Sequence, residues 1–178
     1  MPLYAEYSAT IHGRAHEGVS VRVAKGSDAS AIVAVDATRQ PRPCTHLAWV
    51  TEELARTDAV HVVAEVDGVV IGSSAVKVWS GNLDTPLGWY VSGITVIPQW
   101  RRRYVADRML GAELAWMDNR GESTWSVVSA ANGASLDLHH RHGFGEVARA
   151  ETFAGLTFAG GTGVLLRRRA VPTGTLDR

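Results

Sequence analysis

Apolar and polar positions in this chain follow a strand period near the start and a helical period soon after it. Val19–Ala24 alternates apolar and polar side chains as a strand does, and Ser27 with Asp28 then supplies typical helix-start residues. A proline-rich break at residues 40–43 ends this helix. His46–Arg56 again places apolar residues at helical spacing, so the pattern predicts one strand followed by two helices.

The next part of the chain is rich in β-branched residues. His61–Val66 and Val69–Val78 both have strand composition, and the Asp67-Gly68 pair between them is a strong hairpin signal. Trp89–Ile97 has the same character and ends at Pro98. We therefore expect a hairpin followed by a third strand.

The helical period returns after Tyr104. Val105, Met109, Ala112 and Trp116 lie at positions i, i+4, i+7 and i+11, which places them on one helix face. The spacing therefore predicts a long amphipathic helix.

Four shorter elements complete the pattern: a strand at Thr124–Ala130, a helix at Ser135–His142, and two strands between Val147 and Arg169. The resulting order, β-α-α-β-β-β-α-β-α-β-β, predicts an α/β (α+β) fold with a mixed sheet and helices on both faces. We expect an N-terminal arm over residues 1–18, one domain over 19–170 and a mobile tail over 171–178.

Charge and cysteine content narrow the class of protein. Eighteen basic and eighteen acidic residues give a formal net charge of zero, which argues against a nucleic-acid or anionic-membrane partner. Cys44 is the single cysteine, so an internal disulfide is excluded and a reducing, cytoplasmic setting fits best. We expect no secretory signal and no membrane span.

The first candidate site lies where the strand at 89–97 leads through a turn into the long helix. A helix N-terminus presents unpaired backbone N–H groups and favours an anion, and Arg101, Arg102 and Arg103 stand at this point. Guanidinium groups match phosphate oxygens in bidentate geometry, so a nucleotide-like cofactor is plausible. The alternative is that the three arginines form only a solvated face.

The second candidate site lies about thirty residues further on, between Asn132 and Phe144. Ser135, Leu138, His139 and His142 lie at positions i, i+3, i+4 and i+7. One helix face thus carries a hydroxyl and two imidazoles and could meet a substrate. His140 and His142 lack the carboxylate or cysteine partners of a metal site, so we expect no metal.

Taken together, these two stretches resemble a known family. The motif V-x-P-x-W-R-x-R-x-x-A opening a helix, followed by N-x-x-S-x-x-L-x-x-x-x-G-F, is similar to the paired motifs of GNAT N-acetyltransferases, which use acetyl-coenzyme A (acetyl-CoA). The match is strongest over Gly88–Glu146. The resemblance implies a largely antiparallel central sheet and a cofactor cleft between splayed strands at 89–97 and 124–130.

The resemblance also implies roles for single residues in binding acetyl-CoA. The strand backbone would bind the pantetheine arm, the helix start would wrap the pyrophosphate, and the second motif would contact the arm from the other side. In that order the residues are Ile94, Thr95 and Val96; Arg101, Arg102, Arg103, Tyr104, Val105 and Ala106; and Asn132, Ser135 and His139. Tyr104 stands where the family usually has glycine, so either its backbone avoids positive φ or the loop is strained.

Catalysis needs a proton for the leaving thiolate and a group that accepts the proton of the amine. His139 stands where many family members have a proton-donating tyrosine, and we hypothesise that it donates a proton as a neutral N–H group. The alternative is that His139 only packs at the helix end. Glu65 and Asp84 are weak candidates for the general base, and water is another.

The function predicted from these features is acetyl transfer to a primary amine of a small molecule, for example an aminoglycoside. The alternatives are a protein or peptide amine acceptor and a non-catalytic CoA-binding module. Trp49, Trp79 and Trp89 are candidates for the wall of the acceptor pocket. A homodimer is also expected.

Overall fold

A computed structural model of the chain describes residues 13–81 and 84–170. The tail predicted for 171–178 lies outside the described residues, as do the first twelve residues of the predicted arm. The described part of the arm, residues 13–18, contains no helix or strand.

Seven strands form one mixed sheet within these described ranges. In spatial order they are β1 (Ser20–Val23), β2 (Ala59–Val66), β3 (Val69–Trp79), β4 (Gly88–Val96), β5 (Thr124–Ser129), β9 (Gly163–Arg168) and β6 (Gly145–Ala150). All neighbouring pairs are antiparallel except β4 and β5, which run parallel. The predicted mixed, largely antiparallel sheet is confirmed.

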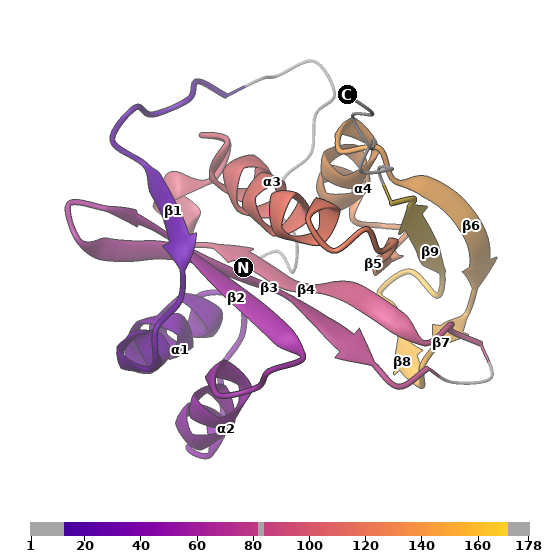
Figure 1. The fold of residues 1–178 in the computed structure, drawn as a ribbon, viewed down its shortest axis with the longest axis horizontal. Coiled ribbons are helices and arrows are strands. Elements are labelled where there is room, and N and C mark those ends of the chain that lie inside the picture. The colour runs from indigo at the N-terminus through magenta and orange to yellow at the C-terminus, as the bar shows by residue number, and fades with distance from the viewer. Residues whose placement is uncertain (1–12, 82–83, 171–178) are drawn as a thin grey trace, which may run out of the picture.

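Helices cover both faces of the sheet, as the periodicity predicted. The described α-helices are α1 (Ala29–Ala37), α2 (His46–Leu54), α3 (Val105–Asp118) and α4 (Gly133–Arg141). Two 3-10 turns, η1 (Gly26–Asp28) and η2 (Pro98–Trp100), precede α1 and α3. Helices α1 and α2 lie on one face and α3 on the other (Figure 1), and α4 shares a hydrophobic cluster with α3.

The turn between β2 and β3 shows how directly the sequence specifies part of this sheet. Asp67 and Gly68 have φ values of 50° and 77°, the left-handed conformation that a two-residue type I′ hairpin requires at both positions. Aspartate and glycine tolerate this conformation better than most residues. The predicted hairpin is confirmed.

Two details differ from the sequence-based expectation. Between β6 and β9 the chain forms an additional short hairpin of β7 (Thr152–Phe153) and β8 (Leu156–Thr157), which two-residue strands are too short to signal by alternation. The buried face of α3 begins at Val105 and Met109 as predicted but continues through Glu113 and Met117. Trp116 instead lies against Trp89, with ring centroids 5.2 Å apart.

Glu113 places a carboxyl group in the core under α3. Its side chain is 0% exposed, and neither carboxyl oxygen has a hydrogen-bond partner. Desolvation raises the pKa of Glu113 to about 8, although nearby Ser74 on β3 offsets part of the rise. The group is therefore mainly protonated and uncharged at neutral pH, which lets it remain in an apolar environment.

No helix in the described ranges is long and apolar enough to cross a membrane.

Replacing Glu113 by glutamine should weaken the pH dependence of stability. The folded-state pKa of about 8 lies above the ordinary value of 4.5, so between these pH values the folded protein holds a proton that the unfolded chain has lost. Stability therefore falls as pH rises through this window, by up to about 1.4 kcal/mol per pH unit. Urea unfolding at pH 5 and pH 8 should show a smaller loss for Glu113→Gln than for the unmodified protein.

The matched control is Glu122→Gln, because Glu122 is exposed. This variant should retain the pH dependence of the unmodified protein. Equal pH dependence in the unmodified protein and in Glu113→Gln would contradict the interpretation of Glu113.

Candidate functional site

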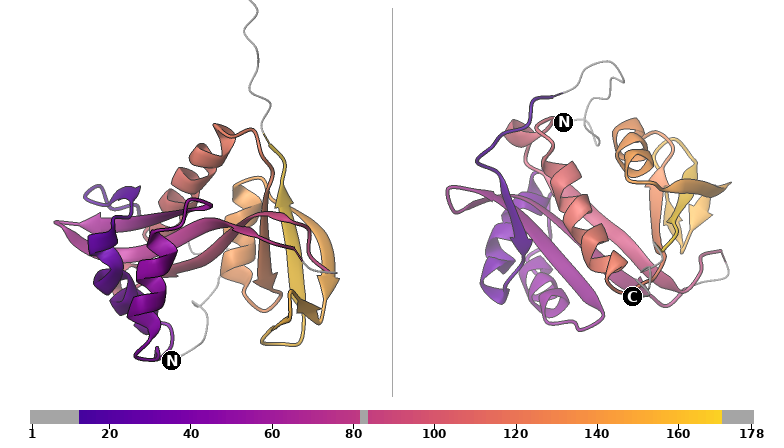
Figure 2. Two further views of the ribbon diagram at one scale, coloured as in Figure 1. Left: turned by 60° about the horizontal axis from the view of Figure 1, so that its bottom comes forward. Right: turned by 45° about the horizontal axis from the view of Figure 1, so that its top comes forward.

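The main cavity follows from the parting of two neighbouring strands. β4 and β5 pair only at Trp89 with Thr124 and at Tyr90 with Trp125. Beyond these pairs the strands of the C-terminal half turn away from β4 (Figure 2). A cavity of about 520 Å³, which we call the large groove, is lined by both strands where they have parted. The predicted cleft between residues 89–97 and 124–130 is thus confirmed.

A β-bulge in β4 shapes the middle of the large groove. Ser73 pairs with Thr95, but Ala75 pairs with Ser92, so Gly93 and Ile94 interrupt the ladder. Gly93 has a φ of 71°, which glycine adopts without the steric cost that other residues meet. The bulge therefore leaves backbone groups free to face a ligand.

The N-terminus of α3 forms one end of the groove. The first helical hydrogen bond runs from the Arg108 N–H to the Tyr104 carbonyl at 3.0 Å, so the N–H groups of residues 105–107 have no acceptor within the helix. Arg101 and Arg102 line the same end. The combination of helix dipole, N–H groups and guanidinium groups suits a phosphate.

The loop before α3 has an unusual backbone. Tyr104 has φ 60° and ψ 18°, and Arg102 also has a φ of 60°. The question raised by the sequence is thereby answered: the backbone at Tyr104 does take the left-handed conformation, although the residue is not glycine. Such a conformation costs of order 1 kcal/mol or more for a residue with a side chain.

The first turns of α4 form the opposite wall. The Asn132 side chain caps the helix, because its Oδ1 accepts a hydrogen bond from the Ser135 N–H at 3.2 Å. Asn132, Ser135 and His139 all line the large groove. The second motif thus faces the first across one cavity.

His139 presents a lone pair to its surroundings. The ring is 2% exposed, and Nδ1 lies 2.7 Å from the Ser135 carbonyl oxygen, so Nδ1 carries the proton and donates it. Nε2 is then an acceptor, and it has no partner in the described structure. Burial lowers the pKa of His139 to about 4, so the ring is neutral at physiological pH. Donation from Nε2 would require the other tautomer and loss of the bond to Ser135.

All but one of the predicted cofactor residues meet at this cavity. The residues that line it are Ile94, Thr95, Val96, Arg101, Arg102, Tyr104, Val105, Ala106, Asn132, Ser135 and His139. Arg103 does not line it, because its guanidinium group lies over the Trp100 ring, 4.8 Å from the ring centroid. Adjacent residues in this extended loop point in different directions, which the run of three arginines does not reveal.

A second, smaller cavity lies beside the first. This small pocket, of about 140 Å³, is lined by residues of α1, α2 and strands β2 to β4. Arg39, Gly93 and Thr95 line both cavities. The bulge in β4 is therefore the place where the two cavities meet.

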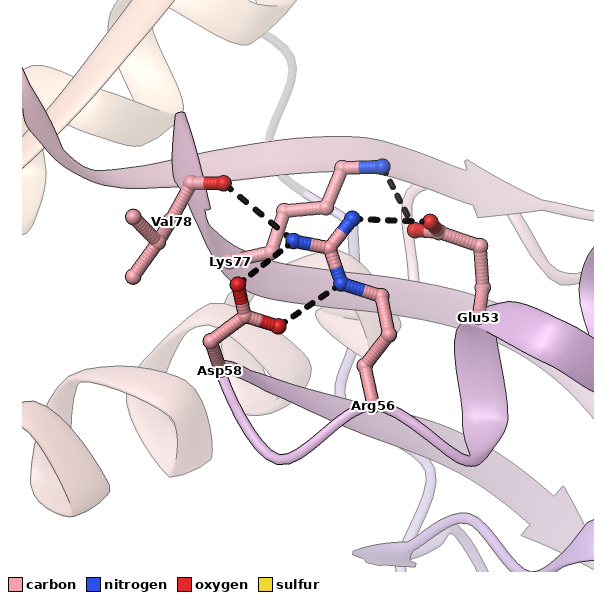
Figure 3. Close-up of polar contacts among 5 residues, drawn as sticks. All are labelled: Glu53, Arg56, Asp58, Lys77 and Val78. Atoms are coloured by element: carbon pink, nitrogen blue, oxygen red, sulfur yellow. Dashed lines mark hydrogen bonds and ion pairs between the residues drawn. The ribbon is translucent and has the colours of Figure 1, made fainter. Parts of the chain in front are cut away.

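An ion-pair network anchors α2 to the sheet beside the small pocket (Figure 3). Glu53 contacts Lys77 Nζ at 2.6 Å and Arg56 Nη1 at 3.0 Å, and Arg56 also holds Asp58. Burial would raise the pKa of Glu53, but hydrogen bonds from Lys77 and Arg56 outweigh it and lower the pKa. Glu53 and Lys77 therefore largely neutralise each other.

The small pocket also contains a carboxylate-imidazole pair. His46 Nε2 lies 3.0 Å from Asp36 Oδ2, and Ser73 Oγ lies 3.5 Å from the other Asp36 oxygen. Because Ser73 pairs with Thr95 beside the bulge, the pair lies close to the junction of the cavities. His61 lines the same pocket with an unpartnered Nε2, and desolvation lowers its pKa.

The sequence analysis did not single out these residues. His46, Val50 and Glu53 are the buried residues of α2 and lie at positions i, i+4 and i+7. Two ionisable groups on the buried face of a predicted helix were therefore the available signal. The pairing of His46 with Asp36 on α1 depends on helix packing and has no such signal.

The carboxylates suggested as general bases have other roles. Glu65 accepts a hydrogen bond from Arg22 Nε at 2.9 Å, and Asp84 accepts one from the Ala154 N–H at 3.0 Å. Neither lines the large groove or the small pocket.

Of the three tryptophans suggested for an acceptor pocket, Trp49 lines the small pocket. Trp79 and Trp89 line neither cavity. Trp79 stacks on Tyr90, with ring centroids 4.7 Å apart, and Trp89 is 5% exposed in the core.

Comparison with protein families finds one matching model over much of the chain. Residues 31–144 match the acetyltransferase (GNAT) family. Aminoglycoside N(6')-acetyltransferase type 1 of Salmonella typhimurium is 31% identical over 108 residues, which cover 58% of this chain and 74% of that protein.

Solved structures share the fold at low sequence identity. An acetyltransferase from Salmonella typhimurium, determined with its cofactor acetyl-CoA, has a TM-score of 0.71 and 18% identity and covers 90% of this chain and 99% of its own. The ribosomal-protein-S18-alanine N-acetyltransferase of Escherichia coli has a TM-score of 0.70 and 15% identity, with the same coverage of 90% and 99%.

Two substitutions at Tyr104 should separate the backbone conformation from the side chain. Tyr104→Gly and Tyr104→Ala both remove the ring, but only glycine adopts positive φ without strain. We expect the glycine variant to be more stable than the alanine variant by about 1 kcal/mol in urea unfolding. A glycine variant less stable than the alanine variant would contradict the left-handed conformation at this position.

Proposed function

This chain belongs to the acetyltransferase (GNAT) family, and we propose that it transfers the acetyl group of acetyl-CoA to a primary amine of a small molecule. The observation that carries the proposal is the parting of β4 from β5 beside the N-terminus of α3. This arrangement joins an anion site to exposed strand edges in one groove.

The residues of the large groove fit acetyl-CoA. The N–H groups at the start of α3, with Arg101 and Arg102, would hold the pyrophosphate. Between residues 91 and 96, β4 has no ladder partner on the β5 side, so its backbone can bond to the amides of a pantetheine arm. Asn132 and Ser135 would contact that arm from α4.

The bulge in β4 would be the place of transfer, because it lies between the two cavities. Acetyl-CoA supplies a thioester whose carbonyl is the electrophile. Backbone N–H groups at Gly93 and Ile94 are suited to stabilise the oxyanion that develops there. An amine in the small pocket would reach the same point past Thr95.

Two proton transfers accompany the reaction. The Asp36–His46 pair, in the small pocket, would accept the proton of the amine, directly or through water. The hydrogen bond of His139 to Ser135 leaves a lone pair and no proton at Nε2. We therefore propose that His139 helps to position the cofactor and that solvent supplies the proton of the leaving thiolate.

A small-molecule acceptor is supported by the size of the small pocket, about 140 Å³, below the range of about 300–1,000 Å³ typical of drug-sized ligands. The aminoglycoside N-acetyltransferase relative supports an amine as the acceptor. The predicted homodimer, cytoplasmic location and lack of a nucleic-acid partner stay predictions.

The first test is calorimetric titration of CoA and acetyl-CoA, followed by a thiol-release assay with a panel of amines. Charge reversal in Arg101→Glu/Arg102→Glu should weaken CoA binding by about a hundredfold or more, since each contact is a charge-assisted hydrogen bond. Arg103→Glu is the control, because Arg103 lies on Trp100 outside the groove, and it should change affinity far less.

Equal loss of affinity in the two variants would favour the sequence-based assignment of all three arginines. Absence of CoA binding in the unmodified protein would overturn the proposed function. CoA binding without thiol release from any amine would support a non-catalytic module.

The roles of Asp36 and His139 can be separated by turnover at constant cofactor affinity. Asp36→Asn should lower turnover about a hundredfold, as loss of a general base commonly does. His139→Gln should lower it less than tenfold and leave the pH profile above pH 6 unchanged, because the pKa of His139 is about 4. The reverse pattern, with CoA affinity retained, would identify His139 as the proton donor.

A further inference from the structure

Two arginines of the small pocket have no protein partner. Arg39 follows the end of α1, and Arg42 lies in the loop before α2; both line the pocket. Neither makes an ion pair or a side-chain hydrogen bond with any residue in the described ranges. Other arginines of this face, such as Arg56, hold carboxylates.

Arg42 is the more unusual of the two. Its Nε is buried and has no hydrogen-bond partner among the described residues. A buried N–H of a charged group without an acceptor is costly and is rarely left so in a native protein. An oxyanion bound to the Arg42 guanidinium group would remove this cost.

The sequence around Arg42 favours such a role. Pro41 and Pro43 stand on either side of it, and proline fixes its own φ and restricts the residue before it. The loop is therefore held with little conformational freedom, so less entropy is lost when Arg42 binds a ligand.

The remaining charges of the small pocket do not compensate Arg39 and Arg42. The two carboxylates in the lining, Asp36 and Glu53, face His46 and the Lys77–Arg56 pair respectively. Three basic side chains, Arg39, Arg42 and Lys77, thus stand against two carboxylates. The pocket has an excess of positive charge at the end formed by Arg39 and Arg42.

We propose that Arg39 and Arg42 bind an oxyanion of the acceptor, so that the substrate is a small amine that also carries a carboxylate or a similar acidic group, as free amino acids do. This inference rests on the proposed function, because it assigns the acceptor of the same site. Arg39 lines both cavities, which places the anion site within reach of an amine at the β4 bulge.

This acceptor class differs from the polycationic sugars named for the curated relative. An aminoglycoside would bring several positive charges to a pocket with two unpaired guanidinium groups, and like charges at short range repel. Trp49, Ile32 and Val50 also line the pocket and offer an apolar surface for an amino-acid side chain.

The first experiment compares an amino acid with its carboxamide, which retains the amine and loses the negative charge. Thiol release with leucine and leucinamide should show kcat/KM at least about tenfold higher for leucine. Arg42→Gln should abolish most of this preference and Arg42→Lys should retain part of it, while the affinity for CoA stays unchanged. Arg169→Gln, at an exposed position outside both cavities, is the control and should retain the preference.

Two outcomes of this experiment would overturn the inference while leaving the proposed function intact. One is equal or better turnover of leucinamide, or of the aminoglycoside kanamycin, by the unmodified protein. The other is a leucine preference that survives in both Arg39→Gln and Arg42→Gln. The same assay with glutamate and with aminomethylphosphonate shows whether a side-chain carboxylate or a phosphonate serves as the oxyanion.

The second experiment needs no turnover. N-acetylleucine and N-acetylleucinamide are titrated calorimetrically into the CoA-loaded protein. Binding of the acid at least tenfold tighter than the amide, lost in Arg42→Gln, supports the anion site even if no amine releases thiol, an outcome that would overturn the proposed function alone. Equal binding of the two compounds would overturn the inference.

Discussion

The two hydrogen-bonded pairs between β4 and β5 are the constraint on which the rest of the site depends. They hold the strands parallel at one end, and beyond them each strand has an edge without a ladder partner. Unpaired backbone groups need another acceptor or donor, so the parting creates a demand that a ligand with amide groups can meet. A parallel pair also requires a crossover helix, and that helix is α3, whose N-terminus lies at the open end.

The bulge at Gly93 connects this groove to the opposite side of the sheet. Its φ of 71° interrupts the β3–β4 ladder, and the residue lines both cavities. One substrate can therefore approach along the α3 and α4 side while the other approaches from α1 and α2. The charges of the two cavities suit different anions: Arg101 and Arg102 lie beside a helix N-terminus, whereas Arg39 and Arg42 lie in a small pocket partly walled by Trp49.

Three buried polar groups without partners show how their surroundings determine their meaning. Glu113 lies in the core away from both cavities, so it lowers its cost by remaining protonated. His139 lines the large groove and is neutral, with its single proton committed to Ser135. The guanidinium group of Arg42 stays charged at any accessible pH, and only an anion from outside the chain can complete its hydrogen bonding.

The sequence by itself determined the element order, the Asp67-Gly68 hairpin and the stretches that line the large groove, because each depends on neighbouring residues. Local period and turn chemistry specify such features, and the two motifs are contiguous segments. Only the tertiary structure decided that Arg103 lies on Trp100, that Glu113 is buried, and that Asp36 meets His46. Side chains from α1, α2 and β3 come together through packing of elements distant in the chain, and no local pattern encodes which of them will share a pocket.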